Sequence, residues 1–147
     1  MSNIKAIPDG YTTVTPFMNI KNAAEAIKHY NEAFGAEVVR EHLRPDGKIA
    51  IAVLKIGNSF VHVSDAINDP ETSSGIQLSV ENADAWWQRA VDAGCQVRMP
   101  LQDTPWGMRF GTLTDKIGNR WSVAQRVEDV SPEELERRMA QHALNQK

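Results

Sequence analysis

The sequence has little cysteine, few aromatic residues and no excess of positive charge. Cys95 is its single cysteine, which excludes an internal disulfide and the paired-cysteine motifs of zinc sites. No apolar run approaches the roughly 18 residues that a membrane helix needs, and no basic-then-apolar signal segment is present at the N-terminus. These absences together predict a cytoplasmic protein without a membrane partner.

The charge balance excludes a further class of function. The net charge is −3 with a pI near 5.8, and the basic residues are scattered, so no basic stripe for nucleic acid is present. With 41% hydrophobic and 24% charged residues, the composition is typical of a globular protein. A length of 147 residues fits one domain with its own core.

The chain repeats itself at an offset of about sixty residues. The stretch that begins at Ile20 (Ile-Lys-Asn-Ala-Ala-Glu) returns at Val80 as Val-Glu-Asn-Ala-Asp-Ala, and Lys55-Ile-Gly-Asn returns as Lys116-Ile-Gly-Asn. Two echoes in the same order indicate an internal duplication. In each copy an asparagine, Asn22 or Asn82, is expected to cap an amphipathic helix that ends at a glycine.

Each copy continues with three strand-like segments after its helix and has one before it. The expected strands are 11–20, 36–43, 48–56 and 59–65 in the first copy, and 75–80, 95–99, 108–115 and 119–127 in the second. We therefore predict an α+β fold of tandem β-α-β-β-β modules in a single domain, 1–147. Module one spans about 11–66 and module two about 74–128. A polar stretch near 66–74 joins them, and a helix capped by Ser131 follows at about 131–143.

Particular segments resemble a known family. Ile7-Pro-Asp-Gly-Tyr11, Pro45-Asp-Gly-Lys-Ile49, Trp106-Gly-Met-Arg-Phe-Gly111 and Gly118-Asn-Arg-Trp-Ser-Val123 resemble the PhnB-like branch of the vicinal-oxygen-chelate superfamily. That superfamily includes glyoxalase, extradiol dioxygenases and bleomycin resistance proteins. The resemblance implies curved mixed sheets around a cavity, a small-molecule ligand and a homodimer.

Metal-dependent members of that superfamily hold an ion with four side chains, two from each module. Counting from the strand ends and turn glycines, the resemblance implies that these positions are Thr15, Val61, Gly75 and Ser122. None offers the lone pair of a His, Glu or Gln side chain, so we expect neither a metal nor a cofactor. Gln77, on the same strand face as Gly75, is the one alternative ligand for a divalent metal.

Histidine and cysteine give no catalytic constellation. Strand alternation places His62 on the opposite face from Val61 and Val63, and we expect it to pack against a helix. His42 ends a strand and is expected at the rim of the cavity, and Cys95 is expected to be an inert core residue.

The expected binding residues are a mixture of apolar and polar side chains. Strand parity predicts that Thr15, Phe17, Gln77 and Ser122 line the cavity. Trp106 is expected to stack on a planar ligand, or instead to cap the mouth of the cavity. Arg109 is expected to clamp a carboxylate or phosphate, or instead to pair with Asp115 or Asp103.

Two functions remain open at this point. The first is a metal-free protein that binds a neutral or anionic organic molecule, in the manner of the drug-sequestering resistance proteins. The second is a metal-dependent lyase, isomerase or dioxygenase with an unusual ligand set, such as Gln77 with His42 or with a residue of a partner chain. Whether the chain is an enzyme is left undecided by the sequence, and a purely structural role is a third possibility.

Overall fold

The structure is a computed structural model that describes residues 4–66 and 75–146. The chain divides into two compact units, Met1–Ser74 and Gly75–Lys147. The division falls in the polar stretch that was expected to join the modules, most of which, 67–74, lies outside the described residues. Within the described residues, no helix has the length and apolarity needed to span a membrane.

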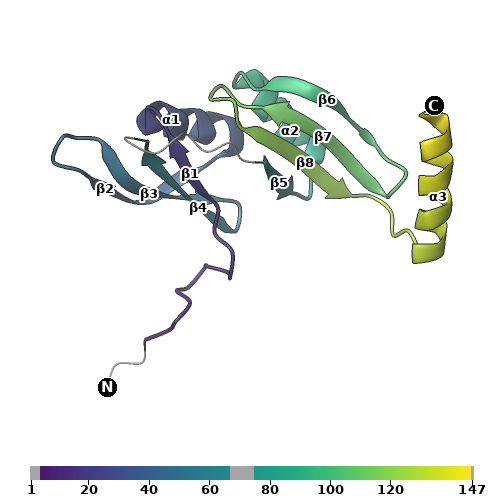
Figure 1. Cartoon of the computed structure of the whole chain (residues 1–147), viewed down its shortest axis with the longest axis horizontal. Coiled ribbons are helices and arrows are strands. Elements are labelled where there is room, and N and C mark those ends of the chain that lie inside the picture. Colours follow the sequence, from purple (N-terminus) through teal and green to yellow (C-terminus); the bar gives the residue numbers. More distant parts are fainter. Residues whose placement is uncertain (1–3, 67–74, 147) are drawn as a thin grey trace. The chain divides into compact units, whose positions relative to one another are not determined.

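The first unit is one β-α-β-β-β module (Figure 1). Its elements are β1 (Phe17–Ile20), α1 (Ala23–Phe34), β2 (Glu37–Leu43), β3 (Ile49–Ile56) and β4 (Ser59–Asp65). The sheet has the order β1-β4-β3-β2, with β1 parallel to β4 and the other neighbours antiparallel. β1 is shorter than the predicted strand 11–20, because its pairing starts only where the His62 N–H donates to the Pro16 carbonyl.

The second unit repeats this module and adds a helix. Its elements are β5 (Gly75–Ser79), α2 (Ala83–Asp92), β6 (Gln96–Asp103), β7 (Met108–Thr114), β8 (Arg120–Arg126) and α3 (Pro132–Asn145). The sheet order, β5-β8-β7-β6, matches the first unit position by position, again with one parallel pair. The predicted α+β class, the tandem modules and the C-terminal helix are therefore confirmed, and each sheet is open rather than closed into a barrel.

Each module buries one face of its sheet under its own helix. In β4, Val61 and Val63 are 3% and 0% exposed, and the corresponding residues of β8, Trp121 and Val123, are buried as well. Helix α1 contacts β1, β3 and β4, and α2 contacts β6 and β8 (Figure 1). Because side chains alternate along a strand, the residues between these buried positions lie on the opposite face. We call that face the open face of each sheet.

Two of the three predicted N-terminal helix caps are present, and the third is not. Asn82 and Ser131 cap α2 and α3 by accepting from the N–H groups of Ala85 and Glu134. The prediction that Asn22 caps α1 is wrong. Asn22 adopts the left-handed conformation, with φ 59°, and its side chain makes no capping bond. The Asp65 carboxylate at the end of β4 accepts from the N–H of Ala23 instead, at 2.8 Å.

Candidate functional site

The strand registers align one row of four side chains across the open face of each sheet. Residues that pair directly across strands point to the same face. In the first sheet the row is Phe17, His62, Val53 and Arg40. In the second sheet the corresponding row is Gln77, Ser122, Thr112 and Met99.

These rows correct the predicted position of Val61. The turn glycine does not hold the same place in the two loops. Gly57 lies three residues before the paired residue Phe60, whereas Gly118 lies two residues before its counterpart Arg120. Counting from the turn glycine therefore places the equivalent of Ser122 one residue too early in the first module. Val61 lies on the helix face, 3% exposed, and His62 takes the position opposite Phe17 on the open face.

The prediction that His62 packs against a helix is wrong for the same reason. Its Nε2 lies 2.8 Å from the Tyr11 hydroxyl, and its ring meets that of Phe17 with centroids 6.3 Å apart. Burial, with a further contribution from the positive charge of Arg40, lowers the pKa of His62 below its usual value. The imidazole is therefore neutral at pH 7, and it is a hydrogen-bonding group rather than a charge.

Around His62 the first sheet carries an aromatic cluster, which we define as Tyr11, Phe17, Phe60 and His62. The rings of Tyr11 and Phe60 lie 4.5 Å apart. The segment that brings in Tyr11 needs glycine at position 10, because φ there is +84° and a Cβ would lie 2.6 Å from the Phe60 ring. Phe17 is 52% exposed, so the cluster offers an apolar ring surface to solvent.

The second sheet has a smaller and more polar set of predicted residues on its open face. Gln77 and Ser122 are direct partners, and the Gln77 amide lies 3.5 Å from the Ser79 hydroxyl. In the first unit, Thr15 lies two residues before Phe17, in the segment that precedes β1. The structure thus brings Gln77 and Ser122 together in one row, and it leaves Thr15 outside the strand ladder.

Arg109 lies on the other face of its sheet. Its strand partner is Gln125, whose side chain binds the start of α2, so Arg109 points toward α2 and away from the face of Ser122. The guanidinium pairs with Asp84 at 2.9 Å and with Asp103 at 3.2 Å. Of the two expected partners, Asp103 and Asp115, Arg109 pairs with Asp103. Because its guanidinium is engaged in ion pairs on the helix side, we exclude Arg109 from our candidate site.

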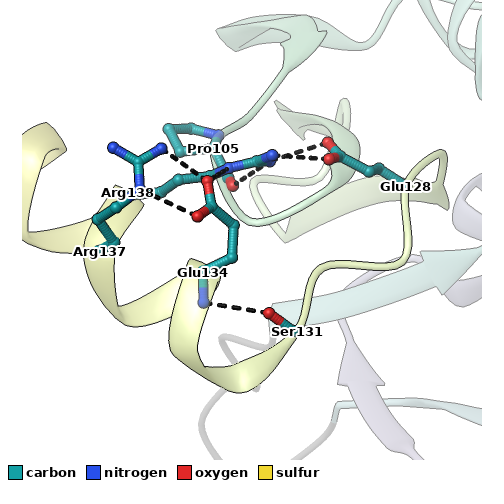
Figure 2. Close-up of polar contacts among 6 residues, drawn as sticks. All are labelled: Pro105, Glu128, Ser131, Glu134, Arg137 and Arg138. Carbon is teal, nitrogen blue, oxygen red and sulfur yellow. Dashed lines mark hydrogen bonds and ion pairs between the residues drawn. The ribbon is translucent and has the colours of Figure 1, made fainter.

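Trp106 lies in the turn that precedes β7, beside α3. Its ring meets Phe110 with centroids 6.5 Å apart, and it meets His142 of α3 at 6.1 Å. Arg138 of α3 binds the Glu128 carboxylate at 2.7 Å and the Pro105 carbonyl at 3.4 Å, and it also binds Glu134 (Figure 2). Helix α3 is therefore tied to the turn that carries Trp106.

The attachment of α3 is expected to weaken in acid. Hydrogen bonds from Arg137 and Arg138 lower the pKa of Glu134 to about 2. Because this folded-state pKa lies below the unfolded value of about 4.5, the contribution of Glu134 is complete above pH 4.5 and is lost as the pH falls toward 2. The indole N–H resonance of Trp106 should shift over that interval in NMR spectra. Glu134→Gln should remove this transition, whereas Glu136→Gln on the same helix should leave it unchanged.

Cys95 has an unreactive thiol, and the candidate metal positions lack a full set of ligands. Burial, with Asp115 nearby, raises the pKa of the Cys95 thiol to about 11, so it is a poor nucleophile. Within the described ranges, no three His, Cys, Asp or Glu side chains are close enough together to hold an ion. In the first unit β1 and β4 pair Phe17 with His62, and only His62 is a competent metal ligand. In the second unit β5 and β8 pair Gln77 with Ser122, and only Gln77 is a competent ligand. This donor set does not fit a four-ligand metal centre.

Comparison with known proteins places the chain in a family. Residues 11–123 match the sequence model of the Glyoxalase/Bleomycin resistance protein/Dioxygenase superfamily. A Mycobacterium bovis protein, named only as uncharacterized, is 33% identical over 139 residues, which cover 86% of this chain and 91% of the relative.

Solved structures with the same fold include the following two. The PhnB protein of Bacillus cereus is 22% identical with a TM-score of 0.58, over 78% of this chain and 99% of its own. TnmS3, an antibiotic binding protein from Streptomyces sp. CB03234, is 18% identical with a TM-score of 0.63, over 86% of this chain and 99% of its own. The duplicated module, its strand order and the match over residues 11–123 agree, and the chain belongs to the Glyoxalase/Bleomycin resistance protein/Dioxygenase superfamily.

Proposed function

We propose that this protein binds a small organic molecule with an aromatic group, without a metal, on the open face of its sheets. The observation that carries this proposal is the aromatic cluster of the first sheet. The Phe17 ring is 52% exposed on a sheet face. Contact between apolar surface and water is unfavourable, so a flat ligand that covers this ring gains binding free energy. The Tyr11–His62 pair adds polar atoms that orient a ligand through hydrogen bonds.

Two further observations support a binding role over a catalytic one. The donor set of the open faces does not fit the four-ligand metal centre on which the enzymes of this superfamily are expected to depend. In addition, TnmS3, which shares the fold, is an antibiotic binding protein by name. On the first sheet we propose Tyr11, Thr15, Phe17 and His62 for ligand contact. On the second sheet we propose Gln77, Trp106 and Ser122.

A thermal-shift screen with planar aromatic compounds tests this proposal. The panel should contain neutral and anionic members, and each compound should be tested with EDTA and again with Zn²⁺. A ligand that binds only the folded chain raises the unfolding temperature, and the rise increases with the logarithm of the ligand concentration above its Kd. We expect shifts that increase with ligand concentration and are the same under both conditions. The absence of a concentration-dependent shift for every compound, or shifts that require Zn²⁺, would contradict the proposal.

A metal-dependent lyase, isomerase or dioxygenase is the second candidate, and the position of His62 favours it. The imidazole is a better ligand than the valine that counting had placed there. In the second unit Gln77 lies in the corresponding row, at the position that Phe17 takes in the first. Elemental analysis of the untagged protein, purified without chelator, tests this candidate. Retained metal near one ion per chain, lost in His62→Ala or in Gln77→Ala, would establish it.

We also propose a homodimer, as the superfamily resemblance implies. Light scattering coupled to size-exclusion chromatography should give a mass of about twice the 16.4 kDa of one chain. A mass that stays at that of one chain at every loading concentration would contradict the dimer.

A further inference from the structure

A β-bulge determines which side chain of β2 reaches the open face of the first sheet. Val38 pairs with Leu54, but the next pair joins Arg40 to Val53, so Val39 is an extra residue without a partner. In a regular ladder Val39 would lie opposite Val53. Bulges commonly re-aim a side chain next to a functional site, and here the bulge brings Arg40 into the row of Phe17 and His62.

Arg40 is an exposed cation on this face. Within residues 4–66 and 75–146, no hydrogen bond or ion pair engages its guanidinium. Its direct neighbours in the row are Val53 and then His62, neither of which carries a negative charge. Of the acids of β2, Glu41 alternates to the helix face, and Glu37 lies on the open face directly opposite Lys55. The positive charge of Arg40 is therefore left to interact with a ligand.

We propose that the open face of the first sheet binds a planar aromatic anion, with its ring on Phe17 and His62 and its oxyanion on Arg40. This inference rests on the proposed function and names the ligand class for that site. Neighbouring strands lie about 4.8 Å apart, so about 10 Å separates the backbones at His62 and Arg40. A bicyclic aromatic acid together with an arginine side chain spans this distance. The guanidinium can hold a carboxylate through two parallel hydrogen bonds.

A matched pair of probes tests the charge contact. Isothermal titration calorimetry in EDTA should be carried out with 2-naphthoate and with 2-naphthamide, which share the ring and differ in charge. The unmodified chain should bind 2-naphthoate about tenfold more tightly than 2-naphthamide. Arg40→Gln should weaken 2-naphthoate about tenfold and leave 2-naphthamide unchanged, which removes the preference. Lys28→Gln, an equal change of charge on the exposed side of α1, should preserve both affinities.

The outcomes separate this inference from the proposed function. If Arg40→Gln keeps the preference for 2-naphthoate, or if 2-naphthamide binds the unmodified chain as tightly as 2-naphthoate, the inference is overturned while aromatic binding stands. If neither probe binds, the inference is also overturned, and the proposed function then depends on the remaining members of the thermal-shift panel. Unchanged unfolding temperatures of both variants confirm that the comparison concerns binding and not folding.

Discussion

Replacing Asp115 with alanine is expected to lower the free energy of unfolding by about 3–5 kcal/mol. Asp115 is 4% exposed. One of its carboxylate oxygens accepts from the backbone N–H groups of Ile117, Gly118 and Asn119 at 2.8–2.9 Å. The other accepts from the indole N–H of the buried Trp121 at 2.8 Å. The substitution leaves these donors without their acceptor, in the loop that sets the register of β7 and β8.

Urea unfolding followed by tryptophan fluorescence measures this loss, because the four tryptophans, at positions 86, 87, 106 and 121, all lie in the second unit. Asp129→Ala is the matched control. It removes an exposed carboxylate that pairs with Arg126 at the surface, and such pairs contribute about 0–1 kcal/mol. Equal stabilities of the two variants would show that Asp115 does not organise the loop as described.

Replacing Phe17 with alanine is expected to weaken binding of both 2-naphthoate and 2-naphthamide about tenfold or more, a loss of about 1.4 kcal/mol or more. The reason is that Phe17 supplies the exposed ring surface of the aromatic cluster, which both probes would cover whatever their charge. Titration calorimetry of the variant with each probe measures the effect. This pattern differs from that of Arg40→Gln, which should affect the carboxylate alone.

Leu43→Ala is the control for Phe17→Ala. Leu43 is a similarly exposed apolar side chain at the end of β2, 58% exposed, and it lies outside the aromatic cluster. Its loss should leave both affinities unchanged. An equal weakening by Leu43→Ala, or none by Phe17→Ala, would place the ligand elsewhere on the protein.

The architecture could be predicted from the sequence because its signals are local and occur twice. Helical spacing, strand alternation and the two echoes gave the modules, and Asn82 and Ser131 cap as their residue types predict. Asn22 shows where local reasoning fails. The backbone there turns left-handed, and Asp65, distant in the sequence, takes over the helix start. A contact across more than forty residues gives no local signal.

The candidate site was harder to predict because it depends on the register between strands. The turn glycine lies one residue further from the paired strand in the first unit than in the second. Counting from it moved the expected position from His62 to Val61, and this changed which face was assigned. Arg40 was missed because the bulge at Val39 cannot be recognised from the residue types alone. Arg109 illustrates the reverse case, since the sequence shows a cation beside a tryptophan but not the two aspartates that bind it.

The most direct test of metal-free aromatic binding is an NMR titration of the ¹⁵N-labelled protein with 2-naphthoate in the presence of EDTA. The account predicts saturable chemical-shift changes in the first unit that centre on the open-face row, at Phe17, Val53 and His62. It also predicts small changes on the buried face of α1, at Ala26 and Tyr30. Changes that appear only when Zn²⁺ replaces EDTA, or that centre on α1, would contradict it.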